Sequence, residues 1–181
     1  MANRSYPHKF ETIVQVEATP EELFAELDDQ ERLSAHMMQS SAMMAGNRMH
    51  FDFDAARGRE VGSKMRLSGD MLGFHLEVEE VVTERSPPQR KAWETIGEPH
   101  LLVIGNYRMG FTIEATDAGS QLNVFIEYDE PPQPWTMLAR LLGPTYARWC
   151  TVSMAEGAAK RFQPAAKANV PTTPEQFEHM N

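Results

Sequence analysis

The chain has 181 residues, enough for one domain with a sizeable core, and carries a formal net charge of −9 at pH 7. This acidic balance argues against binding to duplex nucleic acid, whose phosphates require clustered Lys and Arg side chains, and against electrostatic docking on anionic lipid. No apolar run approaches the roughly 20 residues that span a bilayer, and Cys150 is the single cysteine, so we expect a cytoplasmic protein without a transmembrane segment or a disulfide.

The chain opens with a predicted strand and a predicted helix. Met1–Lys9 lacks the apolar stretch of a signal peptide. Apolar and polar residues then alternate from about Lys9 to Glu17, which indicates a half-buried strand. The segment Thr19–Glu22 follows, a capping-box pattern with proline at the first helical position, and it predicts the start of a helix. A second short helix is predicted over Gln30–Met37.

The region from Asn47 to Glu130 reads almost continuously as strand. Apolar residues recur at every second position in successive runs, and turn signals at Gly69–Asp70, Ser86–Pro88 and Asp117–Gly119 separate several of these runs. The alternation slips near Glu79–Glu80, where a β-bulge is predicted. Together with the first strand, this region predicts a sheet of seven antiparallel strands.

A long helix is predicted after the strand region, over Pro144–Phe162. Trp135–Leu142 is also helical in pattern, but Gly143–Pro144 is expected to interrupt it, with proline starting a fresh helix. A curved antiparallel sheet wrapped around the long helix would bury the apolar face of each, so we predict an α+β fold. Residues 163–181 are predicted to be a tail, a linker followed by the capping signal of another short helix.

This order of elements resembles the helix-grip fold of the SRPBCC superfamily, also called Bet v 1-like or START-like. Ala18–Phe24 resembles the capped helix of that superfamily, and Val61–Met65 resembles the start of one of its middle strands. Val81–Trp93 is similar to the strand, Pro-Pro turn and Trp-bearing strand of polyketide cyclase/dehydrase-like members. The resemblance covers roughly Lys9 to Phe162, so we predict a single domain over residues 1–162.

The resemblance implies that the sheet and the long helix enclose an apolar ligand cavity. Strand alternation and helical spacing predict that its lining consists of Phe51, Met65, Leu67, Phe74, Leu76, Trp93, Tyr107, Met109, Phe111, Val124, Ile126, Tyr128, Tyr146, Trp149 and Ser153. The hydroxyls of Tyr107 and Tyr128 would orient a carbonyl or hydroxyl group of the ligand. The alternative is that these side chains pack a closed core and that the hydroxyls reach the surface.

Few polar groups are predicted on the inner face of the sheet. The strand alternation places tyrosines and Thr95 there, but assigns it no Lys and no carboxylate outside the predicted bulge. Glu80, turned inward at that bulge, and His36, at the mouth of the cavity, are the acid–base candidates. The six histidines are scattered without the spacing of a metal site, so no metal or cofactor is expected. Cys150 is interpreted as a buried, inert thiol.

Three functions are compatible with these predictions, because a fold does not fix a function. The leading hypothesis is the binding of a small hydrophobic molecule, lipid-like or aromatic and polyketide-like, by a monomer or a homodimer. The rival is an enzyme of the polyketide cyclase, aromatase or dehydratase type that uses the same cavity. It is less favoured because Met, Phe and Trp offer little to move a proton. The third hypothesis is a protein-interaction or assembly module.

Overall fold

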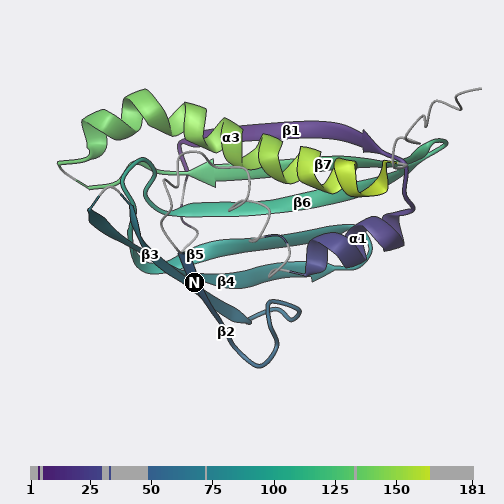
Figure 1. Cartoon of the computed structure of the whole chain (residues 1–181), viewed down its shortest axis with the longest axis horizontal. Helices are drawn as coiled ribbons and strands as arrows, with labels where there is room; N and C mark the ends of the chain where they lie inside the picture. The colour runs from purple at the N-terminus through teal and green to yellow at the C-terminus, as the bar shows by residue number, and fades with distance from the viewer. Residues whose placement is uncertain are drawn as a thin grey trace, which may run out of the picture.

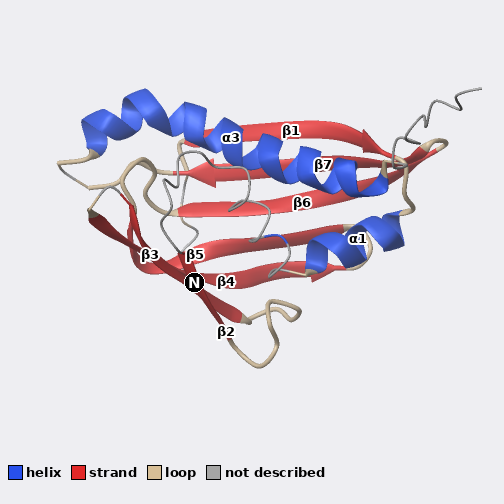
Figure 2. Cartoon of the chain, viewed as in Figure 1, coloured by secondary structure: helices blue, strands red, loops and turns tan. Residues whose placement is uncertain are grey.

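A seven-stranded antiparallel sheet and two helices form the described part of the computed structural model (Figures 1 and 2). The structure describes residues 4, 6–29, 33, 49–71, 73–132 and 134–163. In chain order the elements are β1 (His8–Val16), α1 (Pro20–Asp28), β2 (Met49–Phe53), β3 (Lys64–Met71), β4 (Phe74–Ser86), β5 (Arg90–His100), β6 (Tyr107–Thr116), β7 (Gly119–Tyr128) and α3 (Thr136–Phe162).

The strands are arranged in the order β1-β7-β6-β5-β4-β3-β2, and every neighbouring pair is antiparallel. Strands β2 to β7 therefore form a meander, and β1 pairs with β7 as the edge strand opposite β2. Figure 1 shows α1 and α3 on the same face of the sheet. Helix α3 packs mainly on β1 and β7, whereas α1 contacts β6, β7 and α3. The predicted sheet with its long C-terminal helix is confirmed.

Helix α1 begins where the capping signal places it. The hydroxyl of Thr19 accepts a hydrogen bond from the backbone N–H of Glu22, and the Glu22 carboxylate accepts one from the backbone N–H of Thr19. These two bonds satisfy donors that a helix start would otherwise leave unpaired. The predicted second helix, Gln30–Met37, lies outside the described residues except for Leu33, which is helical and buried. The predicted tail lies outside them after Gln163.

Helix α3 runs without interruption from Thr136 to Phe162 and contains Pro144 in its interior. The predicted break before this proline is therefore wrong. Pro144 has no backbone N–H for the carbonyl of Arg140, a defect that destabilises a helix by about 3 kcal/mol. Close packing explains why the helix continues: at the buried Gly143, an added Cβ would lie 2.9 Å from the carbonyl oxygen of Val103. Tertiary contacts thus override the local preference.

The burial of β4 alternates without the predicted slip, although its pairing with β5 is irregular close to Glu79, where the β-bulge is predicted. Its even-numbered residues from Leu76 to Val82 are all buried, whereas Val81 is half-buried on the opposite face. Glu80 therefore faces inward because of plain alternation. The pairing with β5 changes register on either side of it, between Glu77 and Glu79 and between Val82 and Glu84.

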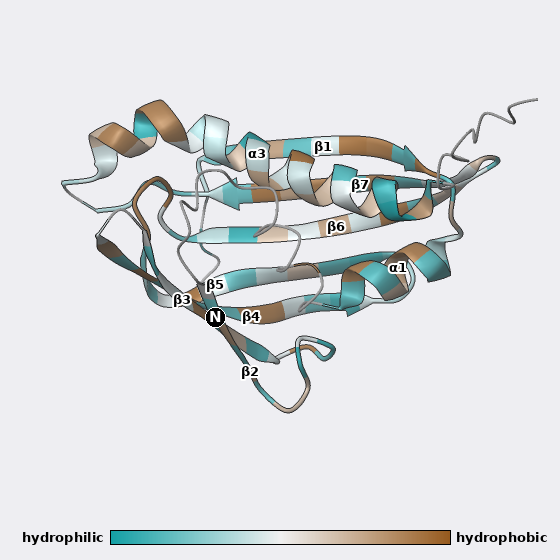
Figure 3. Cartoon of the chain, in the orientation of Figure 1, coloured by the Kyte–Doolittle hydropathy of each residue, from teal (hydrophilic) through white to brown (hydrophobic). Residues whose placement is uncertain are grey.

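The core lies between the inner face of the sheet and the two helices, and its largest fully buried side chains include Leu23, Phe111 and Met154. Apolar residues also lie outside this core. Figure 3 shows them along the first turns of α3, where Met137 and Leu141 are 85% and 73% exposed.

Candidate functional site

A polar cluster lies inside the apolar core and combines Glu80 of β4, Trp93 of β5 and Tyr107 of β6. All three side chains are buried, and Glu80 is only 4% exposed. The hydroxyl of Tyr107 donates a hydrogen bond to the Glu80 carboxylate, and the indole N–H of Trp93 donates a second. The three strands are adjacent in the sheet, so strand alternation alone brings these side chains to the same inner surface.

The electrostatics of this cluster differ from those of a surface carboxylate. Burial raises the pKa of Glu80 to about 7, although the hydrogen bonds from Tyr107 and Trp93 oppose the shift. Protonated and ionised forms of Glu80 are therefore both accessible near neutral pH. Burial and the neighbouring charge of Glu80 raise the pKa of Tyr107 well above its ordinary value, so its hydroxyl remains a hydrogen-bond donor.

Helix α3 contributes a second polar pair, Tyr146 and Cys150, to the same interior. The two side chains are hydrogen-bonded to each other, and the ring of Tyr146 lies 5.8 Å from that of Trp149. Ionisation of Tyr146 or Cys150 would raise the pKa of Tyr107 further, because the helix pair lies close to the sheet cluster. Burial raises the pKa of the Cys150 thiol to about 12. The thiol therefore stays protonated at neutral pH, as the interpretation of an inert cysteine requires.

Most side chains predicted to line a cavity lie in the interior. The buried ones are Met65, Leu76, Trp93, Tyr107, Met109, Phe111, Val124, Ile126 and Tyr128. The half-buried ones are Phe51, Leu67, Tyr146, Trp149 and Ser153. Phe74 is not part of this group, since it is 43% exposed and its ring packs edge-on against Trp135, 5.1 Å away. His36, the other acid–base candidate, lies outside the described residues.

Lys91 is the inner-face residue that the sequence-based interpretation missed. It is fully buried beneath the end of α1, where its Nζ donates to the carbonyl oxygen of Asp28 at 2.9 Å and lies 3.0 Å from Asp28 Oδ1. Arg85 binds the same carboxylate at 2.8 Å. Strand alternation could have predicted that Lys91 faces inward, because it stands two residues before the inward-facing Trp93. Its contacts tie α1 to β4 and β5.

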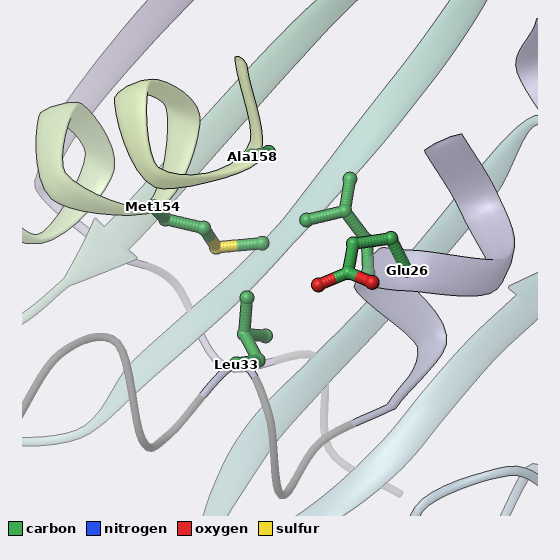
Figure 4. Close-up of a pocket in the computed structure, with 5 residues that line it drawn as sticks. Glu26, Leu33, Met154 and Ala158 are labelled. Carbon is green, nitrogen blue, oxygen red and sulfur yellow. The ribbon is translucent and has the colours of Figure 1, made fainter. Parts of the chain in front are cut away.

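A narrow apolar gap separates the end of α1 from α3 (Figure 4). Its lining consists of Glu26, Leu27, Leu33, Met154 and Ala158. The gap has a volume of about 10 Å³, room for about one water molecule. An ion pair of 2.9 Å between Glu26 and Arg161 also joins the two helices. This part of the interior is therefore closely packed.

Two further observations bear on the class of protein. Among the residues that the structure describes, no helix is long and apolar enough to cross a membrane. Within the same residues, His, Cys, Asp and Glu side chains do not gather into groups of three that would hold a metal ion.

Comparisons with known proteins show the fold. No protein-family model and no curated protein sequence matches the chain. Among solved structures, it is similar to TTHA0849 from Thermus thermophilus, with a TM-score of 0.63 and 15% identity over 86% of this chain and 97% of that one. It is similar to CV1439 from Chromobacterium violaceum, with a TM-score of 0.58 and 14% identity over 88% of this chain and 100% of that one.

A plant protein is among the similar structures as well. The major latex-like protein 151 of Panax ginseng gives a TM-score of 0.57 and 14% identity, over 87% of this chain and 98% of that one. These structures match nearly their whole length, so the likeness concerns the complete arrangement of sheet and helices. The chain therefore has a helix-grip fold, a curved antiparallel sheet packed on a long C-terminal helix, as these structures do.

Proposed function

We propose that the protein binds a small hydrophobic ligand between the inner face of the sheet and α3, with the Glu80–Tyr107 pair as the polar anchor. The single observation that carries this proposal is a carboxyl group, hydrogen-bonded to Tyr107, inside a largely apolar core. Removing such a group from water costs free energy unless its partners compensate for it. A core that served only stability would be better filled by an apolar side chain.

The chemistry of the anchor suits a ligand that carries one hydroxyl or carbonyl group. The protonated form of Glu80 can donate a hydrogen bond and its ionised form can accept one, and both are accessible near neutral pH. The surrounding side chains supply apolar and aromatic contact area, which is typical of small-molecule sites. A lipid-like or aromatic, polyketide-like molecule meets both requirements.

Binding requires the interior to make room, because the gap between α1 and α3 accommodates about one water molecule. Methionine side chains favour this, since they are unbranched and adapt to irregular shapes. Met65, Met109 and Met154 are all buried in the core. We propose that these side chains repack when the ligand enters.

Titration with the apolar fluorescent probe anilinonaphthalene sulfonate tests the proposal. We expect saturable binding that Tyr107→Phe and Trp149→Leu both weaken, because each removes a contact inside the proposed site. Trp135→Leu is the matched control, since it removes an indole that packs against the exposed Phe74 at the start of β4. Circular dichroism establishes that each variant is folded. Unchanged affinity in both interior variants would contradict the proposed site.

One specific observation favours the alternative that the protein is an enzyme: the pKa of Glu80, beside the Tyr107 hydroxyl, is raised. A carboxyl group with a pKa near the working pH is suited to general acid–base catalysis. The alternative predicts turnover of a polyketide-like substrate, with Glu80→Gln abolishing turnover while probe binding survives. We favour binding alone, because the polar groups of the described interior are few and already hydrogen-bonded to one another.

A further inference from the structure

A second hollow lies at the surface, between the end of α1 and the loop that joins β2 to β3. Its volume is about 270 Å³, and Asp29, Phe53, Arg57 and Arg59 line it. This is close to the lower end of the volumes of small-molecule sites, roughly 300–1,000 Å³. We call it the Arg57–Arg59 pocket.

The β2–β3 loop that forms one wall of this pocket is tightly organised. The Asp54 carboxylate accepts hydrogen bonds from the Ser63 hydroxyl at 2.6 Å and from the backbone N–H of Lys64 at 2.8 Å. The Ser63 hydroxyl oxygen in turn accepts one from the backbone N–H of Gly58 at 2.8 Å, and Ser63 is itself buried. The loop therefore holds its shape without a ligand, which reduces the entropy lost on binding.

Arg57 has an unusual backbone conformation within this loop. Its φ of 51° lies in the left-handed region, which non-glycine residues rarely adopt. The backbone N–H of Arg57 donates to Asp54 Oδ1 at 3.0 Å, and this contact helps to hold the conformation. Strained residues that the surrounding structure holds in place occur preferentially at ligand-binding positions. Arg57 and Arg59 both line the hollow.

The lining of the pocket is mainly charged and includes one aromatic side chain, Phe53. Arg57, Arg59 and Asp29 supply its charged groups, and Nη2 of Arg59 lies 3.2 Å from Oδ2 of Asp29. A guanidinium group matches the planar oxygens of a carboxylate or a phosphate. Phe53 is the aromatic side chain of the lining; it is half-buried, and the neighbouring ring of Phe51, 6.4 Å away and tilted by 10°, packs against it.

We propose that the Arg57–Arg59 pocket binds a small anion, a carboxylate or a phosphate monoester, that carries an aromatic ring. The anionic oxygens contact the two guanidinium groups, and the ring packs on Phe53. Asp29 competes with the ligand for Arg59. This site is separate from the interior site proposed above and does not depend on it.

Isothermal titration of the full chain with phenyl phosphate, inorganic phosphate and benzoate tests this proposal. Phenyl phosphate and benzoate separate the two kinds of anion, and inorganic phosphate measures the contribution of the ring. We expect Arg59→Gln to weaken binding about tenfold, because it removes charged hydrogen bonds. Asp29→Asn should strengthen binding, because it removes the competing carboxylate. Arg66→Gln on the solvent-facing side of β3 should have no effect.

The opposite signs expected for Arg59→Gln and Asp29→Asn make the outcome decisive, and thermal unfolding verifies that both variants are folded. Affinity for the aryl anions should also fall with added salt, as for any contact between exposed charges. Three results would overturn the proposal: no saturable binding of either aryl anion at about millimolar concentration, equal losses in Arg59→Gln and Arg66→Gln, or weaker binding in Asp29→Asn.

Discussion

Phe125 lies across Gly110 on the outer face of the sheet, where the two residues are direct partners in the register of β6 and β7. A Cβ added at Gly110 would come within 2.8 Å of the ring atom Cζ of Phe125 and within 2.4 Å of the carbonyl oxygen of Lys91. The guanidinium groups of Arg90 and Arg108 lie 5.8 Å and 5.3 Å from the ring centroid. Gly110 leaves room for the ring of Phe125, and the two arginine side chains cover it. This explains why Phe125 is only 5% exposed on a face that no described helix covers.

Gly110→Ala should therefore destabilise the protein. We expect the free energy of unfolding to fall by about 1–3 kcal/mol, the usual cost of an overpacked site. Urea denaturation measures this change. The double variant Gly110→Ala with Phe125→Leu should not recover the loss, because the contact with the backbone carbonyl of Lys91 remains. Recovery in the double variant would show that the ring alone limits the space.

Pro144→Ala should stabilise the protein. Pro144 is exposed in the interior of α3, so alanine removes little packing and restores a backbone donor for Arg140. Alanine is favoured over proline by about 3 kcal/mol inside a helix, while the loss of the rigid proline from the unfolded chain offsets about 0.4–1 kcal/mol of this. We expect a net gain of about 2 kcal/mol in thermal or urea unfolding.

Pro20→Ala is the matched control for Pro144→Ala, because Pro20 occupies the first turn of α1, where the missing N–H has no intrahelical partner. The same substitution should give no gain at that position. Equal gains at both positions would contradict the explanation, since the effect would then not come from the interrupted hydrogen bond of α3.

Lys91→Met should destabilise the protein by about 1–3 kcal/mol, measured by urea denaturation. The substitution keeps most of the apolar stem but removes the donor to the carbonyl oxygen and the carboxylate of Asp28. Arg85 keeps its own contacts with this carboxylate, which limits the loss. Lys64→Met is the control: its ion pair with Glu79 is exposed, and such pairs contribute little.

The contacts of Asp28 with Lys91 and Arg85 predict that the protein loses stability in acid. Burial alone would raise the pKa of Asp28, but the hydrogen bonds from Arg85 and Lys91 and the charges of these two side chains outweigh it and lower the pKa. The stabilising contribution of Asp28 is therefore complete above its ordinary pKa and is lost as the pH falls through the lowered value. Lys91→Met should reduce the decrease in the free energy of unfolding that acid causes, because Asp28 then has one partner fewer.

The sequence predicted those elements whose signals are local. Thr19 and Glu22 form a capping box within four residues, and the strands follow from the alternation of neighbouring side chains. Pro144 misled the prediction because packing against a segment about forty positions earlier in the chain, at Val103, decides whether α3 continues. Local preference is the weaker influence at such a position.

The candidate site was predicted only in part, for a similar reason. The apolar and aromatic lining follows from alternation, and alternation also places Lys91 on the inner face, but the buried partner that makes a charge tolerable there is not visible in the sequence. Lys91 and Asp28 are 63 positions apart, and no local pattern joins them. Glu80 was named because a bulge was expected to turn it inward, whereas the unbroken alternation of burial in β4 already places it there; the register irregularity lies in the pairing with β5.

Glu80 should make the stability of the protein depend on pH in the opposite direction to Asp28. Its pKa rises from 4.5 to about 7 on folding, so its stabilising contribution is complete below pH 4.5 and is lost as the pH rises toward 7. A shift of this size corresponds to about 3 kcal/mol at most, since each unit of pKa is worth 1.36 kcal/mol. The loss should level off above pH 7, where Glu80 is ionised in both states.

Glu80→Gln isolates this contribution, because the amide keeps the volume and still accepts a hydrogen bond from Tyr107 but does not ionise. The free energy of unfolding of the variant, relative to the unsubstituted protein, should rise by up to about 3 kcal/mol between pH 4.5 and pH 8. Glu79→Gln, on the opposite face of β4, should show no comparable trend. A pH-independent difference for Glu80→Gln would mean that Glu80 ionises as readily in the folded protein as in the unfolded chain. The interior would then hold a hydrated carboxylate, and the anchor proposed for the hydrophobic ligand would lose its physical basis.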